Sequence, residues 1–395
     1  MNLLKNHDLK NKTVLCRVDL NVPMKNGRVQ DATRLNRVLP TIKYLIKQKA
    51  KVVLLSHFGR PKGEFIRDMS LAPLADSLGK ALNTDVKFAI DCIGDATKAK
   101  INDLQAGEVL LLENLRFHAG ETSNNAVFVE KLAQLGDFYI NDTFSCSHRK
   151  HASIVGLAKK LPSAAGLLLQ EEIENLEKIL NIPQKPMAVI VGGSKVSSKL
   201  DLLEALITKA EILVIGGAMA NTFLKAKGNK IGKSLYEPEL VDTAKEIMAK
   251  AEKNNCEIFL PSDVAISTEL KDRADCKIVS ANKVPSDSMI LDLGPQTIAD
   301  LAEKLKSCKT VVWNGPIGAF EYRPFDVGSI TLARYIASLT ADNKIIAVAG
   351  GGDVVAALGV SGLTESFTYI STAGGAFLQW LQGKSLPGIE VLRSA

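Results

Sequence analysis

The sequence predicts an α/β fold with two doubly wound, Rossmann-like parallel-sheet domains joined by a helix. Three observations predict it. The chain has 395 residues, and one hydrophobic core stops growing at roughly 250–300 residues, so two domains are expected. Short β-branched apolar runs alternate with segments of helical periodicity in both halves, which indicates parallel sheets covered by helices on both faces. An amphipathic segment between the halves indicates a helical connector.

The first half contains five apolar runs that we expect to be strands and three segments that we expect to be helices. The runs are continuous rather than alternating, as is typical of strands buried on both faces. The expected strands are 13–18, 51–55, 86–90, 108–113 and 137–141, and the expected helices are 35–49, 70–82 and 125–135.

The second half repeats the pattern with six strands and five helices. The expected strands are 187–191, 211–215, 257–260, 310–313, 344–349 and 367–371. The expected helices are 199–209, 218–227, 239–254, 328–338 and 353–359. Between the halves, LLLQEEIENLEKIL is amphipathic and is ended by the two prolines of NIPQKP, which places the domain break near residues 165–186.

Composition indicates a globular protein of the cytoplasm. Apolar residues make up 46% of the chain and charged residues 23%, which are ordinary values. No apolar run reaches the roughly 18 residues that span a bilayer, and the first residues lack a signal core. The six cysteines are scattered without a CxxC pair, which favours reduced thiols over a disulfide framework.

The positive charge is concentrated in the first half, where residues 1–170 contain 25 Lys and Arg but only 16 Asp and Glu. Such a bias attracts an anion, and both a nucleic acid and a small phosphorylated acid are candidates. From charge alone, a solvated surface is an equally good interpretation. A nucleic-acid site is disfavoured because only 5% of the residues are aromatic and no stacking motif is present.

Several loops that directly follow expected strands carry polar or basic residues. Ligands of doubly wound sheets bind at the carboxyl ends of the strands, and the planar guanidinium group suits phosphate. Asp19 and Asn21 could bind hydroxyl groups, although taken alone an Asx turn before the proline is the favoured explanation. A single arginine is more often a surface ion pair, but several together predict an anion pocket. The candidates are Arg34, Arg60, Arg116 and Arg149.

The segment that contains Cys146, His148 and His151 also has the spacing of a zinc site. We rank a metal site below the anion pocket because Arg149 and Lys150 would repel a cation and a further ligand is not evident nearby.

In the second half, MAVIVGGSKVSSK is expected to form a strand, a Gly-Gly turn and a helix. Glycines at 192 and 193 allow close approach of a ligand to the backbone, and a helix start offers free N–H groups to phosphate. Lys195 and Lys199 would share one helix face. This pattern predicts a nucleotide site, and a tight turn before a solvated basic helix is the alternative.

Three more loops of the second half follow strands. Asn314 is followed by Glu321, an acid that could accept hydrogen bonds from ribose hydroxyls. The glycines at 350–352 precede Asp353, which could bind Mg²⁺ carried by a nucleotide or simply cap a helix. The stretch STAGG (371–375) offers a further set of backbone amides. A basic domain for a small anion and a glycine-rich domain for a nucleotide together form a kinase layout.

Ten stretches of the sequence resemble the phosphoglycerate kinase family in order and spacing, from about residue 17 to 388. They are RVDLNVP, SHFGRP, LLENLRFH, SHRKHAS, VGGSKVSSKL, GGAMANTFL, WNGPIGAFE, AGGGDVV, STAGG and GKSLPG. The resemblance implies the fold of that family and reversible phosphoryl transfer between 1,3-bisphosphoglycerate and ADP, giving 3-phosphoglycerate and ATP. It also implies Mg²⁺ with the nucleotide and a monomer, with no nucleic-acid or membrane partner.

The resemblance also implies roles for individual residues. Arg34, Lys195 and Lys199 would be catalytic. The substrate would be bound by Asp19, Leu20, Asn21, Arg34, His57, Phe58, Gly59, Arg60, Arg116 and Arg149. The nucleotide would be bound by Gly193, Lys195, Lys199, Gly217, Asn314, Glu321, Gly351, Gly352, Asp353 and Val354, with Asp353 holding the metal.

By the same resemblance, the chain divides into four parts. Residues 1–166 would bind 3-phosphoglycerate, 167–185 would form the hinge helix, 186–372 would bind the nucleotide, and 373–395 would return to the first domain. Two departures motivate the alternative of a catalytically impaired nucleotide- or anion-binding homologue. Val354 replaces the family's hydroxyl residue, and Ala373 replaces a glycine that a positive φ would require.

Overall fold

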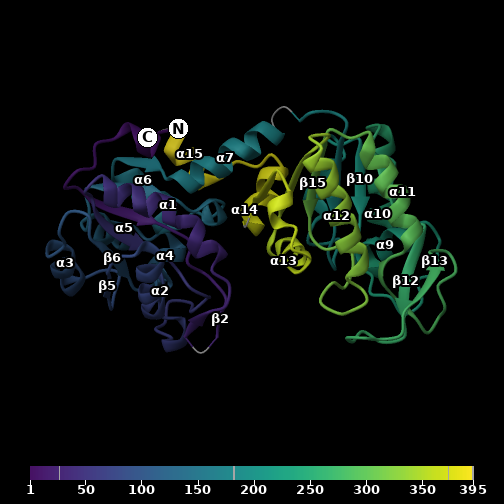
Figure 1. Ribbon diagram of the computed structural model, residues 1–395, viewed down its shortest axis with the longest axis horizontal. Coiled ribbons are helices and arrows are strands. Elements are labelled where there is room, and N and C mark those ends of the chain that lie inside the picture. The colour runs from purple at the N-terminus through teal and green to yellow at the C-terminus, as the bar shows by residue number, and fades with distance from the viewer. Residues whose placement is uncertain (26, 181–182, 372, 394–395) are drawn as a thin grey trace. The chain divides into compact units, whose positions relative to one another are not determined.

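A computed structural model describes residues 1–25, 27–180, 183–371 and 373–393. The chain forms two compact units (Figure 1). Unit 1 contains Met1–Glu174 and Ser385–Ala395, and unit 2 contains Asn175–Lys384. Helix α7 (Leu167–Leu180) coincides with the predicted connector. Among the described residues, no helix has both the length and the apolar character needed to cross a membrane.

Unit 1 contains a six-stranded parallel sheet in the order β5-β6-β4-β1-β7-β8. Its strands are β1 (Thr13–Arg17), β4 (Lys51–Leu55), β5 (Val86–Ala89), β6 (Val109–Leu112), β7 (Phe138–Asn141) and β8 (Ser163–Ala165). The five strands predicted in this half are confirmed. Strand β8 was not predicted because its three small residues lack an apolar β-branched run. A short hairpin, β2 (Met24–Lys25) and β3 (Arg28–Val29), was also not predicted.

Helices α1 and α2 cover one face of this sheet, because their apolar residues share a buried core with alternate residues of β1, β4, β6 and β7. The three predicted helices of this half are confirmed as α1, α2 and α5. The helices of unit 1 besides α7 are α1 (Thr33–Lys47), α2 (Ala72–Leu82), α3 (Asp95–Asn102), α4 (Ala119–Ser123), α5 (Ala126–Ala133), α6 (Leu157–Lys160) and α15 (Pro387–Arg393). Short helical turns include η3 (Leu115–Phe117) and η5 (Ala152–Gly156).

Unit 2 contains a second six-stranded parallel sheet in the order β11-β10-β9-β15-β16-β17. Its strands are β9 (Met187–Val191), β10 (Ile212–Ile215), β11 (Glu257–Phe259), β15 (Thr310–Asn314), β16 (Ile346–Gly350) and β17 (Tyr369–Ser371). All six were predicted. The strand order reverses between β9 and β15, so ligands are expected at the carboxyl ends of these two strands.

The helices of unit 2 are α8 (Leu200–Leu206), α9 (Met219–Ala226), α10 (Val241–Lys253), α11 (Pro295–Lys306), α12 (Val327–Ala341), α13 (Gly352–Ser361) and α14 (Gly374–Leu381). Helices α11, α12 and α13 cover one face of the sheet around the buried Trp313. Helix α11 was not predicted. A three-stranded antiparallel sheet, also not predicted, contains β12 (Asp263–Ser267), β13 (Lys277–Ser280) and β14 (Met289–Leu293).

Candidate active site

In unit 1, the loops after β1 and β7 meet at the point where the strand order reverses. Asp19 Oδ1 accepts from the backbone N–H of Asn21 at 3.0 Å, and Asp19 Oδ2 accepts from Ser145 Oγ at 2.5 Å. Arg34, from the first turn of α1, donates from Nη1 to the Asn21 carbonyl at 2.8 Å and lies 3.6 Å from Asp19 Oδ2. The predicted residues Asp19, Asn21 and Arg34 therefore lie together.

The loop after β4 is held from two sides. Asn21 Oδ1 accepts from the Gly59 N–H at 3.0 Å, and Arg116 Nη1 donates to the Gly59 carbonyl at 2.7 Å. Asn114 fixes the same loop by donating from Nδ2 to the Phe58 carbonyl at 2.8 Å. These contacts join the loops after β1, β4 and β6. Arg60 follows in the same loop and is exposed.

The positive charge of this edge is carried by guanidinium groups rather than by imidazoles. Burial and the neighbouring arginines lower the pKa of His57 and bring the pKa of His151 to about 3. Burial and Arg149 bring the pKa of His148 to about 4. Burial and the nearby Arg149 lower the pKa of Arg116 to about 10. All three histidines are therefore neutral at pH 7, while the arginines stay charged.

Arg116 has unused hydrogen-bonding capacity. Its Nε and Nη2 are buried without a hydrogen-bond partner, and leaving such donors unpaired is costly. The nearby guanidinium group of Arg149 adds repulsion. A dianionic phosphate group would relieve both costs, which agrees with the predicted anion pocket.

Leu20 and Val354 cannot contribute side chains to a ligand site. Both are fully buried in the hydrophobic cores of their units. The backbone of Leu20 is already hydrogen-bonded, because its N–H donates to Ser56 Oγ at 3.0 Å and its carbonyl accepts from the Val22 N–H at 2.9 Å.

A buried arginine that sequence reasoning missed contacts the predicted residue His57. Arg17, at the end of β1, is fully buried. Its Nε donates to Ser153 Oγ at 2.9 Å, its Nη1 donates to the Val18 carbonyl, and its Nη2 lies 2.9 Å from His57 Nδ1. Ser153 Oγ in turn donates to Glu121 Oε1 at 2.6 Å. The available signal was one charged residue inside the apolar run TVLCRV.

The alternative metal site at residues 146, 148 and 151 is not supported. Cys146 Sγ faces Arg17 Nη2 at 3.9 Å, and His148 Nε2 accepts from Arg149 Nε at 3.2 Å. Guanidinium groups therefore face two of the three possible ligands, and a cation would be repelled from both.

In unit 2, Lys199 joins the two strands at which the strand order reverses. Its Nζ donates to the Gly192 carbonyl after β9 at 2.6 Å and to Asn314 Oδ1 at the end of β15 at 2.7 Å. Burial lowers its pKa to about 8, while the nearby Asp353 opposes that shift. A desolvated cation held at this point suits a phosphate group.

Glycine is required where the loops after β9 and β10 touch. Gly217 has a φ of +66°, and a Cβ at this position would lie 2.6 Å from the Gly193 carbonyl oxygen. Any other residue would therefore push the two loops apart. The predicted residues Gly193, Lys199, Gly217 and Asn314 thus form one connected surface.

The prediction that Lys195 and Lys199 share a helix face is wrong. Helix α8 begins at Leu200, so both lysines lie in the preceding loop. The backbone N–H of Ser197 donates to Glu237 Oε2 at 3.1 Å, and its hydroxyl donates to the other carboxylate oxygen. These bonds hold the loop in a non-helical path. Lys195 is exposed.

The loop after β16 leads into α13. Asn314 Nδ2 donates to the Gly350 carbonyl at 2.6 Å, which ties this loop to the end of β15. Gly351 has a φ of +114°, and both Gly352 and Asp353 are exposed. Asp353 acts electrostatically on Lys199. An exposed carboxylate in a glycine-opened turn is an oxygen donor that fits Mg²⁺ carried by a nucleotide.

Two further predicted residues lie in loops of unit 2. Glu321 is exposed in the loop after β15. Ala373 has a φ of −90°, so this position does not require glycine. Thr372, which precedes Ala373 in the STAGG stretch, lies outside the described residues.

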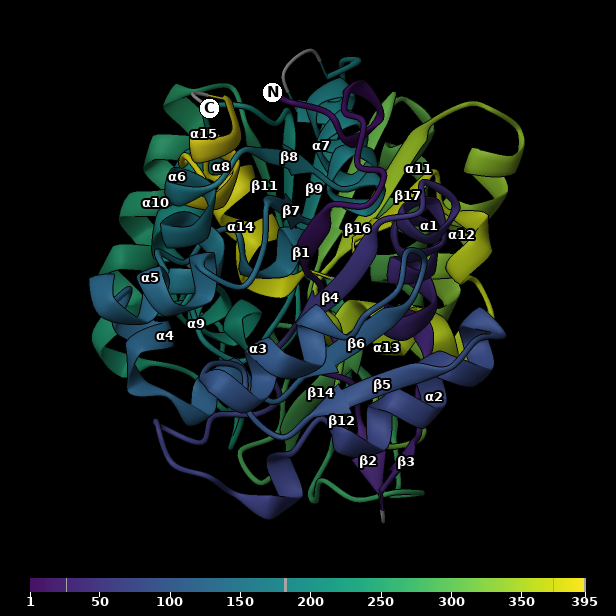
Figure 2. The same ribbon diagram turned by 90° about the vertical axis from the view of Figure 1, so that its left-hand side faces the viewer.

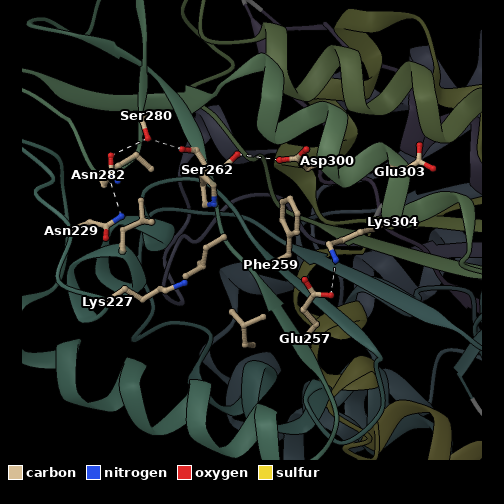
Figure 3. A pocket seen from close by; sticks show the side chains of 15 residues that line it. Lys227, Asn229, Glu257, Phe259, Ser262, Ser280, Asn282, Asp300, Glu303 and Lys304 are labelled. Carbon is tan, nitrogen blue, oxygen red and sulfur yellow. Dashed lines mark hydrogen bonds and ion pairs between the residues drawn. The ribbon is translucent and has the colours of Figure 1, made fainter.

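A cavity of about 710 Å³ lies along the edge strand β11, near the C-terminal end of α9 and beside α11 (Figure 3). Its polar groups are largely paired with each other. Lys304 Nζ binds Glu257 Oε2 at 2.8 Å, and Ser262 Oγ donates to Asp300 Oδ2 at 3.3 Å. The cavity contains none of the predicted nucleotide residues, and we assign it no part in the reaction.

Comparisons with known proteins identify the family. The profile of the family described as "Phosphoglycerate kinase" matches residues 4–384. The chain is 55% identical to the phosphoglycerate kinase of Xanthobacter flavus, with 98% of this chain and 97% of the relative covered. It is 54% identical to that of Methylobacterium radiotolerans, with 98% and 96% covered.

Comparison with solved structures gives the same family. The phosphoglycerate kinase from Coxiella burnetii has a TM-score of 0.89 and 43% identity, with 100% of this chain and 99% of that chain covered. The enzyme from Pyrococcus horikoshii OT3 has a TM-score of 0.87 and 33% identity, with 100% and 98% covered. With a parallel sheet and a cluster of arginines in unit 1 and glycine-rich loops around Lys199 in unit 2, the chain belongs to the phosphoglycerate kinase family.

Proposed function

We propose that this chain is a phosphotransferase with a carboxyl group as acceptor, which transfers a phosphoryl group reversibly between 1,3-bisphosphoglycerate and ADP to give 3-phosphoglycerate and ATP. This is a step of glycolysis and gluconeogenesis. Family membership supports the proposal. The single observation that carries it from the structure is the arginine cluster of unit 1, in which buried donors of Arg116 lack partners.

In unit 1, the substrate is bound by the loops after four strands. Asp19 and Asn21 bind the hydroxyl and carboxyl end of the glycerate, and Leu20 between them holds the loop through its buried side chain. His57, Phe58, Gly59, Arg60, Arg116 and Arg149 form the pocket of the distant phosphate. Because the imidazole of His57 is neutral, it contributes a hydrogen bond, and the arginines supply the charge.

In unit 2, the nucleotide is bound by the loops after β9, β10, β15 and β16. Lys199 and the backbone of residues 351–354 bind the phosphates, and Val354 contributes only its backbone N–H because its side chain is buried. Gly193, Gly217, Asn314 and Glu321 line the adenosine. Asp353 holds Mg²⁺, which when bound neutralises phosphate charge.

The acyl phosphate is already activated, so no general base is needed. A terminal oxygen of ADP attacks the phosphorus in line, the bond from phosphorus to the acyl oxygen breaks, and the carboxylate leaves without net proton transfer. Arg34 and Lys195 stabilise the charge on the transferring group. Each such donor contributes on the order of 3 kcal/mol.

The reaction requires the substrate of unit 1 and the nucleotide of unit 2 to meet without water, which would hydrolyse the acyl phosphate. We propose that residues 167–185 act as the hinge for this motion, between a substrate-binding domain (1–166) and a nucleotide-binding domain (186–372), with 373–395 as the returning tail. We also propose a cytoplasmic monomer with no nucleic-acid or membrane partner.

A coupled assay with ATP and 3-phosphoglycerate, run with and without Mg²⁺, tests the proposal. We expect turnover that requires both substrates and Mg²⁺. Tight nucleotide binding without turnover at millimolar substrate would instead favour the impaired homologue. The negative φ of Ala373 removes one motive for that alternative. At the other position, the side chain of Val354 lies in the core, so the backbone N–H has to serve the nucleotide.

A further inference from the structure

Three side chains of metal-binding type lie together outside both parts of the candidate active site. Asp91 and Cys92 follow β5, the edge strand of the sheet in unit 1 (Figure 2). His118 lies between η3 and α4. One carboxylate oxygen, the thiol sulfur and one imidazole nitrogen all lie within 4.8 Å of one another.

The three groups are held in place by further contacts. Asp91 Oδ1 lies 2.7 Å from His118 Nε2 and accepts from the backbone N–H of Cys92 at 2.6 Å. The His118 ring stacks on Phe128, with ring centroids 5.3 Å apart, which fixes its orientation. The donors are therefore already assembled, and a ligand does not have to order flexible side chains.

The solvent exposure of this cluster and the negative charge around it both favour binding of a cation. The side chains of His118 and Asp91 are 30% and 47% exposed, whereas Cys92 is buried. An ion can therefore approach from the solvent side and keep a water molecule as a further ligand. Asp91 and the buried Glu121 both place negative charge near the Cys92 sulfur.

We propose that Asp91, Cys92 and His118 bind one divalent transition-metal ion, and that Zn²⁺ suits them best. A mixed set of sulfur, nitrogen and oxygen ligands matches zinc, whereas Mg²⁺ and Ca²⁺ prefer oxygen alone. Bond lengths of about 2.0–2.3 Å in a tetrahedral site require the oxygen and nitrogen ligands to be about 3.4 Å apart. The contact between Asp91 and His118 must therefore open slightly, which two partly exposed side chains allow.

This site is independent of the proposed enzymatic function, because its residues share none with the substrate or nucleotide positions. Cobalt titration of the full-length protein, after treatment with a chelator, tests it. We expect one equivalent of Co²⁺ to give the charge-transfer absorption of a cobalt–thiolate bond, and Zn²⁺ to displace it. A chromophoric chelator then gives the Zn²⁺ affinity by competition.

Three variants decide the assignment. Cys92→Ser should abolish the thiolate band, and His118→Gln should weaken Zn²⁺ binding by at least about 10-fold, since even outer contacts of a metal site contribute that much. Cys276→Ser removes an exposed thiol elsewhere and should change neither readout. If the buried Cys92 variant does not fold, the partly exposed His118 variant still decides. Absence of the band in the unmodified protein, or unchanged Zn²⁺ affinity in His118→Gln, would overturn the proposal.

Discussion

Arg34 is positioned by the loop after β1 before any substrate binds. Its Nη1 donates to the Asn21 carbonyl and lies near Asp19. We predict that Arg34→Ala lowers kcat by more than about 100-fold, because the variant loses a donor to the charge of the transition state. ADP affinity should stay the same, since the nucleotide residues belong to unit 2.

Steady-state kinetics and calorimetric ADP titration check this prediction. Arg28→Ala, which removes an exposed arginine from the hairpin strand β3, is the matched control and should keep full turnover. Retained turnover in the Arg34 variant would exclude the role proposed for it.

The lowered pKa of Lys199 predicts that nucleotide binding depends on pH. Burial lowers its pKa to about 8, so the free protein loses this positive charge as the pH rises through that value. ADP affinity should then fall by up to about 10-fold per pH unit above 8. Calorimetry from about pH 7 to about 9.5 measures it. The variant Lys199→Arg keeps its charge in this range, and an equally steep decline in that variant would refute the assignment.

Arg17 shows where the sequence stops being informative about individual residues. The loops with Asp19, Arg116 and Lys199 were predictable, because strand ends are visible as the ends of apolar runs. Arg17 lies inside such a run, and its role depends on Ser153 and Glu121, which are distant in sequence. Only tertiary packing brings these partners together.

At the scale of elements, Asp292 anchors the beginning of α12 to β14. Its carboxylate accepts from the Gly328 N–H at 2.7 Å and the Leu293 N–H at 2.8 Å, and burial raises its pKa to about 7. Between about pH 4 and pH 7 the folded state keeps this proton and the unfolded state does not. The contribution of Asp292 to the free energy of unfolding therefore falls by about 4 kcal/mol as the pH rises through this window.

Urea unfolding at several pH values tests this contribution. Tryptophan fluorescence follows unit 2 specifically, because Trp313 and Trp380 both belong to it. The free energy of unfolding of the unmodified protein, minus that of Asp292→Asn, should fall by about 4 kcal/mol between about pH 4 and pH 8. Asp275→Asn, at an exposed position, should give a nearly flat difference. A flat difference for Asp292→Asn would contradict the prediction.

Elements were predictable where burial on both faces produces an unbroken apolar run. All eleven predicted strands are present in the two parallel sheets. Strands β12 and β13 were missed because their apolar runs, VAI and IV, are short and flanked by polar residues, and β13 is largely exposed. The start of α8 was placed too early because its sequence does not reveal that Glu237, forty residues away, binds Ser197.

At the scale of the whole molecule, the end of the chain completes unit 1. Ile389, Val391 and Leu392 of α15 are buried, the Gly388 N–H donates to the Ser147 carbonyl at 2.9 Å, and the Asn2 N–H donates to the Leu392 carbonyl at 3.2 Å. Ser147 belongs to the loop that carries Arg149.

We predict that deletion of residues 385–395 destabilises unit 1 by roughly 5 kcal/mol, which is the contribution of about three buried aliphatic side chains, and weakens 3-phosphoglycerate binding. Hydrogen exchange of β7 and β8 and calorimetry measure the two effects. ADP affinity of the same variant is the internal control and should be unchanged. Protection of β7 and β8 equal to that of the full chain would show that α15 is dispensable.

Helix α15 also has a consequence for how the protein is made. The ribosome synthesises nearly all of unit 1 first, yet the helix that closes it is synthesised only after unit 2. Unit 2, whose residues are continuous in sequence, is therefore complete earlier. Although N-terminal domains generally fold first during translation, unit 1 cannot be completed here before unit 2 has been synthesised. The apolar surface that α15 covers in unit 1 therefore stays exposed until α15 has left the ribosome.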